Sequence, residues 1–358
     1  MTAPRPFDDG LQRFLRGELS GRDLLAKPTI STVSVLLTYQ CPARCDHCVF
    51  SSGPRRKETV DAGLARRFLR AAARQEPPPL VSFSGGDPFA RLPLMTELAT
   101  LCRDLGLSWE VISSSAWCTS SRRGDEIFAR LAPLGLRTYC TSVDPYHTAH
   151  VDPARLRGAV AAARSHGIAV LINTVSRLDG GEEAYVARTL GMDDGLPDGV
   201  KVNCIKVVPI GRAAEKVTDY LYRDGDEMRE GCPYATEVVP LSPNGRLYSC
   251  CGMVVQDGIA DNPFALADLG GADEDAIAEV LAGVKQDLFF RLLQTVGPYQ
   301  LLRRLAQRHP GLALPGQFVG GCDACCFLMN SPQAVTALWD YLTELSGELT
   351  YSAASSRA

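Results

Sequence analysis

The stretch Thr38-Tyr39-Gln40-Cys41-Pro42-Ala43-Arg44-Cys45-Asp46-His47-Cys48 contains three cysteines in the pattern C-x3-C-x2-C. It follows an apolar run, Val33–Leu37, that is typical of a buried strand. Thiolate sulfur selects zinc, copper(I) or iron–sulfur clusters. A [4Fe–4S] cluster held by three cysteines keeps one iron open for a ligand from outside the protein. Two other interpretations fit the motif by itself: a zinc site with a distant fourth ligand, or ordinary buried thiols.

Composition narrows the class of protein. The 358 residues are 46% hydrophobic and 22% charged, with a formal net charge of −4, which is ordinary for a globular protein large enough for two domains. The acidic balance disfavours a nucleic-acid partner, because phosphate binding needs a basic face. No apolar run approaches the length of a membrane span, and the first residues lack the apolar core of a signal peptide. We therefore expect a cytoplasmic protein, in which the thirteen cysteines serve as cluster ligands rather than as disulfides.

Strand-like and helical patterns alternate from residue 30 to about residue 215. The strand-like runs are Val33–Leu37, Leu80–Ser84, Trp109–Ser113, Thr138–Ser142, Ala169–Asn173 and Val202–Val207. The helical runs between them are Val60–Gln75, Leu92–Leu105, Asp125–Leu134, Pro153–His166 and Glu182–Leu190. This alternation predicts an α/β fold with right-handed crossovers and a parallel sheet that closes only part of an eight-stranded barrel.

The three-cysteine motif and the turn Ser84-Gly85-Gly86-Asp87-Pro88 after the second strand resemble the radical S-adenosylmethionine (SAM) superfamily. The resemblance covers roughly residues 30–215 and implies an open, partial (β/α)6 TIM-like barrel. It implies that Cys41, Cys45 and Cys48 hold a [4Fe–4S] cluster whose open iron chelates the amino and carboxylate groups of SAM. An electron from a reductant such as flavodoxin or ferredoxin would then cleave SAM to a 5′-deoxyadenosyl radical.

Further SAM-binding residues follow from the resemblance and from polar residues at the predicted strand ends, where α/β proteins bind ligands. The family has Gly-Gly-Glu where this chain has Gly85-Gly86-Asp87, and His47 replaces an aromatic residue that packs on the adenine. The segment Val208-Pro209-Ile210-Gly211-Arg212 resembles the family's adenine-binding segment. The predicted SAM-binding residues are His47, Gly85, Gly86, Asp87, Ser114, Ser142, Asn173, Val208 and Arg212. The alternative is that the polar ones are turn and cap residues.

Two residues after the fourth predicted strand, Asp144 and His147, are candidates for catalysis or substrate binding. A histidine can exchange a proton near neutral pH, although many loop histidines have no such role.

The chain also carries a second cysteine pattern. Cys232-x12-Gly245-x4-Cys250 resembles the start of the SPASM and twitch auxiliary-cluster domains, with a hairpin at Ser242-Pro243-Asn244-Gly245. Cys322 and Cys325 would complete the four ligands of one auxiliary [4Fe–4S] cluster. A structural zinc site is the alternative. The adjacent Cys251 and Cys326 are candidates for ligand exchange or for donating a hydrogen atom to a substrate radical.

The predicted domain organisation follows these motifs. It comprises an N-terminal lead (1–29), the barrel (30–215), a small twitch domain of β-hairpin and helix (216–335), and a helix end with a flexible tail (336–358), in which the flexible part starts at Ser352. Helical patterns in the C-terminal part run from Asp275 to about Arg308 and over Pro332–Leu345.

The predicted function is that of a radical SAM oxidoreductase that abstracts hydrogen from a C–H bond. The favoured substrate is a ribosomally made peptide that is epimerised or cross-linked, since auxiliary clusters are common in peptide maturases. One alternative is dehydrogenation or rearrangement of a small natural-product metabolite. Another is a non-catalytic cluster or zinc scaffold, which the intact cysteine motif and the Gly-Gly-Asp turn disfavour.

Overall fold

The computed structural model describes residues 30–177, 180–192, 195–224, 228, 231–232, 234–250, 252, 262–284 and 287–355, with side chains described as far as residue 346. Contacts divide the chain into two compact units. The barrel unit comprises Ile30–Leu221 and Val238–Leu281. The helical unit comprises the described residues of Tyr222–Glu237 and Ala282–Ala358.

A nine-stranded sheet forms the centre of the barrel unit, in the order β10-β9-β8-β1-β2-β3-β4-β5-β6. Its first six strands are β1 (Thr32–Thr38), β2 (Leu80–Gly85), β3 (Trp109–Ile112), β4 (Leu136–Ser142), β5 (Ala169–Val175) and β6 (Val200–Ile205). Each of these pairs in parallel with the next, from β1 to β6. The predicted α/β fold with six parallel strands, a partial TIM-like barrel, is confirmed.

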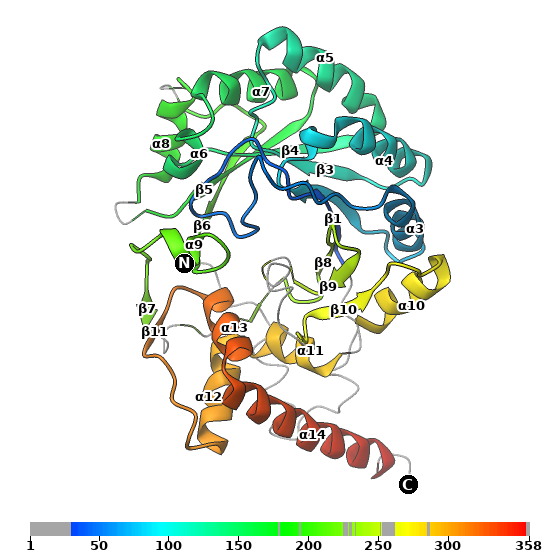
Figure 1. The fold of residues 1–358 in the computed structure, drawn as a ribbon, viewed down its shortest axis with the longest axis vertical. Helices are drawn as coiled ribbons and strands as arrows, with labels where there is room; N and C mark the ends of the chain where they lie inside the picture. The colour runs from blue at the N-terminus through cyan, green and yellow to red at the C-terminus, as the bar shows by residue number, and fades with distance from the viewer. Residues whose placement is uncertain are drawn as a thin grey trace. The chain divides into compact units, whose positions relative to one another are not determined.

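Helices cover one face of this curved sheet, as Figure 1 shows. They are α3 (Ala62–Ala73), α4 (Leu92–Asp104), α5 (Ser121–Leu131), α7 (Pro153–Ser165) and α8 (Glu182–Thr189), and each lies close to its predicted bounds. Side-chain caps fix several starts: Asp61 accepts from the amide of Leu64, and Ser120 accepts from the amide of Arg123. Apolar residues such as Phe68 and Phe128, both inaccessible to solvent, face the sheet and form the core.

The predicted hairpin is present and extends the barrel sheet. Strands β8 (Val238–Leu241) and β9 (Arg246–Tyr248) pair antiparallel, and β9 pairs antiparallel with β10 (Ala265–Asp268). Gly245 has a φ of +82°, which allows the tight turn between β8 and β9. Strand β8 also pairs in parallel with β1, with Thr32 opposite Val238. The hairpin therefore continues the sheet at the free edge of the first strand, and contacts group it with the barrel.

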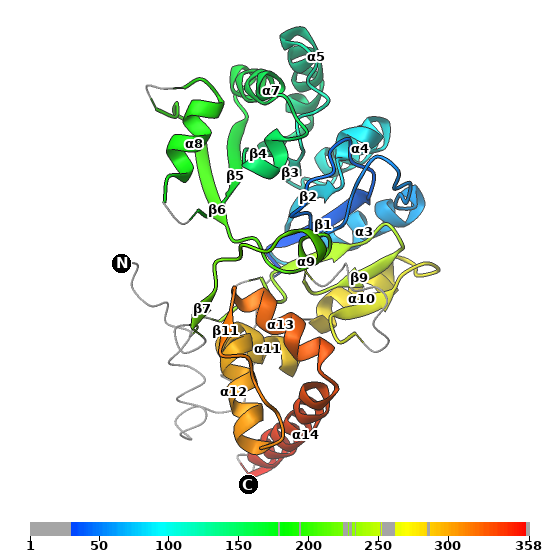
Figure 2. The ribbon, with the colours of Figure 1, turned by 60° about the vertical axis from the view of Figure 1, so that its left-hand side comes forward.

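The helical unit contains α11 (Leu288–Thr295), α12 (Pro298–Arg308), α13 (Gly321–Asn330) and α14 (Pro332–Ser355), with the short antiparallel pair β7 (Arg223–Asp224) and β11 (Gln317–Phe318). Figure 2 shows these elements from a second side. The single helical run expected from Asp275 to Arg308 is three helices, because Asp287 caps a new helix and Gly297-Pro298 starts another; α10 (Glu274–Val284) is the first of them. Helix α14 continues to Ser355, so the tail expected to be flexible from residue 352 is helical as far as it is described.

No helix in the described part of the chain is both long and apolar enough to cross a membrane.

Candidate active site

The cysteine motif lies in a loop after β1, at the edge of the sheet formed by the carboxyl ends of the strands. Residues 41–53 form this loop, which we call the cysteine loop. Backbone hydrogen bonds close it: the amide of Cys41 donates to the carbonyl of Gly53 at 3.2 Å, and the amide of Gly53 donates to the carbonyl of Tyr39 at 3.3 Å. Cys41 and Cys45 are buried and Cys48 is half-buried.

The glycine pair after β2 packs directly on the start of this loop. The amide of Gly86 donates to the carbonyl of Thr38 at 2.6 Å, and the amide of Asp87 donates to the carbonyl of Gln40 at 2.8 Å. A Cβ on Gly86 would lie 2.2 Å from the oxygen of Gln40, and Gly85 has a φ of +123°. Both positions require glycine because two backbones meet there. Their predicted contact with the SAM amino group stays a prediction.

Arg212, which follows β6, holds the cysteine loop from another direction. Its amide donates to the carbonyl of Cys48 at 3.1 Å, its Nη1 donates to the carbonyl of Cys45 at 2.7 Å, and its Nη2 donates to the carbonyl of Ser52. The side chain is buried, with 7% of the residue exposed. The preceding Gly211 has a φ of +62°, and a Cβ there would lie 2.2 Å from the oxygen of Val49. Arg212 thus satisfies three carbonyls of the loop, and its predicted contact with SAM is untested.

Asp87 is directed away from solvent, with 1% of it exposed. Its carboxylate accepts from Ser114 Oγ at 2.5 Å, from Ser113 Oγ at 3.1 Å, and from the amides of Phe89 and Ser114 at 3.0 and 3.2 Å. Burial raises the pKa of Asp87, and these donors oppose the shift. The predicted SAM ligands Asp87 and Ser114 are therefore bonded to each other, which ties the turn after β2 to the end of β3.

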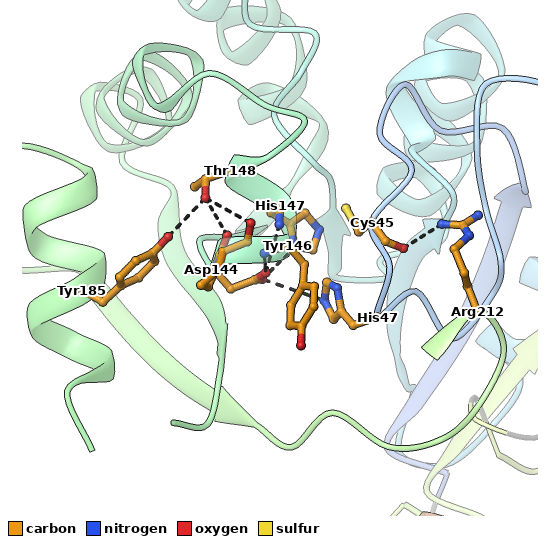
Figure 3. Close-up of polar contacts among 9 residues, drawn as sticks. Cys45, His47, Asp144, Tyr146, His147, Thr148, Tyr185 and Arg212 are labelled. Atoms are coloured by element: carbon orange, nitrogen blue, oxygen red, sulfur yellow. Dashed lines mark hydrogen bonds and ion pairs between the residues drawn. The ribbon is translucent and has the colours of Figure 1, made fainter. Parts of the chain in front are cut away.

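The buried Asp144 and the half-buried His147 form an ion pair beside the cysteine loop (Figure 3). Asp144 starts the short helix α6 (Pro145–Thr148), where its carboxylate accepts from the amides of Tyr146 and His147 at 2.9 and 3.0 Å. His147 Nδ1 lies 2.7 Å from Asp144 Oδ2, and His47 Nε2 lies 3.9 Å from the same oxygen. Asp144 thereby brings both histidines to the carboxyl end of β4.

The two histidines differ in protonation. Burial disfavours the charged form of His147, but the hydrogen bonds with Asp144 and Cys45 and the charges of these two groups together outweigh it and raise the pKa of His147 to about 10. Burial lowers the pKa of His47 to about 4, although the charge of Asp144 opposes that shift. Burial opposes ionisation of Asp144, but the hydrogen bonds and charge of His147 and the charge of His47 together outweigh it and lower the pKa of Asp144. The pair is therefore ionic at neutral pH, while His47 is neutral.

These side chains lie close to the sulfur of Cys45. Cys45 Sγ and one ring nitrogen each of His47 and His147 all lie within 4.8 Å of one another, the one such metal-ligating group among the described residues. Burial raises the pKa of Cys41 to about 12, and the nearby Asp87, Cys45 and Cys48 add to the shift. A metal-bound thiol loses its proton, so a cluster on the cysteine loop would hold Cys41 as a thiolate against the effect of its burial. The buried Nδ1 of His47 has no partner, which fits a ligand or metal at this place.

Two predicted SAM-binding residues are neighbours across the sheet. Ser142 on β4 lies opposite Asn173 on β5, and Asn173 lies opposite Asn203 on β6. Asn203 Nδ2 donates to Asn173 Oδ1 at 3.0 Å. Residues in register on parallel strands share a face of the sheet, so these three form one polar row at the strand ends. Val208 is half-buried in the segment after β6, and its carbonyl accepts from the amide of Ile210 at 2.7 Å.

The sequence reasoning missed Tyr146 and Asn203. The ring of Tyr146 stacks on that of His47, with centroids 4.8 Å apart. The aromatic character of Tyr146, next to the predicted Asp144 and His147, was an available signal. Asn203 had no local signal, because its contact depends on the register between β5 and β6.

The auxiliary cysteines are divided between the two units. Cys250 follows β9 in the barrel unit and is half-buried, whereas Cys232 is half-buried in the helical unit. Helix α13 carries Cys322, Cys325 and Cys326, of which the first is exposed and the other two are buried. Side chains three and four residues apart share a helix face. Cys251 lies outside the described residues, and the auxiliary cluster stays a prediction.

The fold and the site define a class of enzyme in which a partial parallel barrel presents three cysteines for an iron–sulfur cluster beside its strand ends. Residues 35–181 match the model of the Radical SAM superfamily. This match takes in most of β1, the cysteine loop, the glycine pair and β2 to β5, so this part of the chain is similar to a radical SAM domain.

The chain is also similar to one protein in sequence and to two solved structures. The chain is 23% identical over 326 residues to the "Putative peptide biosynthesis protein YydG" of Bacillus subtilis, covering 88% of this chain and 98% of that protein. SuiB of Streptococcus suis, crystallised with the precursor peptide SuiA, has a TM-score of 0.50 at 15% identity, covering 72% of this chain and 67% of SuiB. BtrN in complex with AdoMet and 2-DOIA has a TM-score of 0.45 at 14% identity, covering 76% of this chain and 90% of that one. The likeness to SuiB shows the fold.

Proposed function

We propose that this radical SAM enzyme modifies a ribosomally synthesised peptide, by epimerisation at Cα or by cross-linking. The observation that carries the proposal is the cysteine loop, which is held by Gly86, by Asp87 and by three donors of Arg212. The peptide substrate is supported by the relative from Bacillus subtilis, which is described as a peptide biosynthesis protein and aligns along 88% of this chain.

Cys41, Cys45 and Cys48 would hold the SAM-binding [4Fe–4S] cluster. When bound, this cluster supplies the electron, received from flavodoxin or ferredoxin, that splits SAM and so provides a radical able to abstract hydrogen. The chain's own residues fix the ligands beforehand, because the loop is closed by backbone hydrogen bonds between residues 39, 41 and 53. Preorganised ligands lose less conformational entropy when they bind.

The polar residues at the strand ends would bind SAM and orient the substrate. Ser142, Asn173 and Asn203 offer hydroxyl and amide groups in one row. The partnerless Nδ1 of His47 is available to a ligand atom. The pair of Asp144 and His147 keeps a positive charge within reach of Cys45 Sγ, where it would stabilise a thiolate.

Cys232, Cys250, Cys322 and Cys325 would hold one auxiliary [4Fe–4S] cluster, as four thiolates saturate its irons. Cys326 lies buried one residue beyond Cys325 on α13. In an epimerase, Cys326 or Cys251 would return a hydrogen atom to the Cα radical, with the thiol losing that atom.

Counting iron and sulfide in anaerobically reconstituted protein tests the cluster assignment. We expect about eight irons per chain, falling to about four in a Cys232→Ala/Cys250→Ala variant and to about four in a Cys41→Ala/Cys45→Ala/Cys48→Ala variant. About four irons in both wild type and the first variant would remove the auxiliary cluster. Fewer than about four in the wild type would remove the radical SAM assignment itself.

Incubating the reconstituted enzyme with SAM, a reductant and a candidate precursor peptide in D2O tests the reaction. Epimerisation predicts one deuterium incorporated per modified residue, whereas cross-linking predicts the loss of two hydrogen atoms and no deuterium. SAM cleavage that depends on a small metabolite and not on any peptide would contradict the proposed substrate class.

A further inference from the structure

A basic pocket lies on the outer side of the cysteine loop. It has a volume of about 270 Å³ and is lined by the cations Arg44, Arg55, Arg56, Arg212 and Lys216 and by the single carboxylate Glu215. The whole chain has a net charge of −4, so this concentration of positive charge opposes the overall balance. A cleft lined by one sign of charge focuses the electrostatic field and attracts partners of the opposite sign.

Three of the five cations that line this pocket form no ion pair within the described part of the chain. Arg44, Arg55 and Lys216 are exposed and form no ion pair with any described residue. Arg56 pairs with Glu58 at 2.7 Å, and Arg212 is bonded to the carbonyls of the cysteine loop. The pocket is therefore lined by two cations that have partners within the fold and by three, Arg44, Arg55 and Lys216, that form no ion pair with a described residue.

The pocket and the proposed substrate side lie on opposite sides of Cys45. Figure 3 shows the carbonyl of Cys45 directed toward Arg212, whereas its sulfur is directed toward His147. The strand-end residues Asp144 and His147 lie on the sulfur side. Because Arg44, Ser51 and Gly53 of the cysteine loop line the pocket, an anionic partner there would lie against the loop that carries the proposed cluster ligands.

From these observations, we propose that the pocket lined by Arg44, Arg55, Arg56 and Lys216 is the docking surface for an acidic, one-electron carrier protein. This inference rests on the proposed cluster at Cys41, Cys45 and Cys48. The docked carrier loses one electron and the oxidised cluster gains it, with no atom transferred. Complementary charge speeds the encounter and is weakened by salt.

The test compares reduction of the reconstituted holoenzyme by reduced flavodoxin and by photoreduced deazaflavin, a small neutral donor. In an Arg55→Glu/Lys216→Glu variant we expect the second-order rate of cluster reduction by flavodoxin to fall about tenfold or more at low salt. The difference shrinks at high salt, and reduction by deazaflavin is unchanged. The affinity of this variant for oxidised flavodoxin, measured by calorimetry, is also expected to fall. An Arg55→Lys/Lys216→Arg variant keeps both properties.

An Arg123→Glu/Arg130→Glu variant is the matched control, since both residues are exposed on α5 and the change in net charge is the same. Equal loss in both charge-reversed variants, or unchanged flavodoxin rates in the pocket variant, would overturn the proposal. So would loss of precursor-peptide binding with flavodoxin reduction intact. If neither donor reduces a cluster, the proposed function fails instead, and the calorimetric comparison still decides whether the surface binds flavodoxin.

Discussion

The guanidinium of Arg212 donates to the carbonyl of Cys45 at 2.7 Å across 167 residues of sequence. This bond joins the loop after the first strand of the barrel to the segment after the sixth. Together with the Arg212 bonds to Cys48 and Ser52, it fixes the backbone that carries the cluster ligands without using any thiol. The geometry of the cysteine loop is therefore set by tertiary contacts before any metal binds.

Replacing Arg212 should destabilise the loop and weaken cluster binding. Arg212→Met leaves the carbonyls of Cys45 and Ser52 without their charged donor, and each such bond contributes about 1.5–3 kcal/mol. We expect the free energy of unfolding of the cluster-free protein to fall by about 3–6 kcal/mol, and iron content to fall under limiting iron. Arg212→Lys should give an intermediate result, since one ammonium cannot reproduce a planar fork. Denaturant unfolding and iron analysis measure the two effects.

Arg123→Met, on the exposed face of α5, is the control and should change stability by less than about 0.5 kcal/mol. Full iron loading of Arg212→Met with unchanged stability would show that the loop does not depend on this side chain.

Gly86→Ala should displace the cysteine loop. The added Cβ would lie 2.2 Å from the oxygen of Gln40 and 2.8 Å from the carbonyl carbon of Tyr39, which are backbone atoms that cannot rotate away. We expect a loss of about 1–3 kcal/mol in the free energy of unfolding and a substoichiometric SAM-binding cluster. Gly271→Ala is the matched control, because a Cβ there meets nothing within 4 Å. Equal behaviour of the two variants would mean that the close approach at Gly86 is not required.

Much of the barrel was predictable because strand and helix patterns are local. The apolar runs that became β1 to β5 and the amphipathic runs that became α3, α4, α5, α7 and α8 carry their own periodicity. The pairing of β8 with β1 could not be predicted from the sequence. Val238 and Thr32 are about two hundred residues apart, and nothing in either segment specifies an edge partner. The break at Gly297-Pro298 was readable in principle, because proline after glycine ends helical patterns.

The candidate site was predictable in composition and less so in geometry. The cysteines, Asp144, His147 and Arg212 stand out as residue types at strand ends, and the structure brings His147 and Arg212 to Cys45. The contacts of these side chains could not be predicted from the sequence. Asp87 accepts hydrogen bonds from the serines after β3, and Arg212 donates hydrogen bonds to backbone carbonyls. Such partners depend on tertiary packing, which a motif does not encode.

The ion pair of Asp144 and His147 should show strong energetic coupling. We expect a double-mutant cycle with Asp144→Asn and His147→Gln to give a coupling of about 1–3 kcal/mol in unfolding free energy, because Asp144 is buried and loses its charged partner when His147 is replaced. The exposed pair Arg122–Glu126, 2.8 Å apart on α5, is the control and should give about 0.3–0.5 kcal/mol. Equal coupling in the two cycles would show that the pair near Cys45 is no stronger than a surface ion pair.

Glu110 predicts a dependence of stability on pH. It lies half-buried on β3, with an oxygen 4.0 Å from Cys140 Sγ, and burial raises its pKa above the usual 4.5, against a hydrogen bond from Ser82. A raised carboxyl pKa means that the folded state holds its proton longer than the unfolded chain does. This contribution to stability is present below about pH 4.5 and is lost as pH rises through the raised pKa.

The neutral variant Glu110→Gln lacks this loss. We therefore expect its melting temperature, relative to wild type, to rise between pH 4 and pH 8, with the gain appearing only on the neutral side. Thermal unfolding of the cluster-free proteins across that range measures it. Glu279→Gln, at an exposed position of α10, controls for the loss of one charge. A difference between Glu110→Gln and wild type that does not change with pH, or that changes equally in Glu279→Gln, would mean that burial of Glu110 does not control its ionisation.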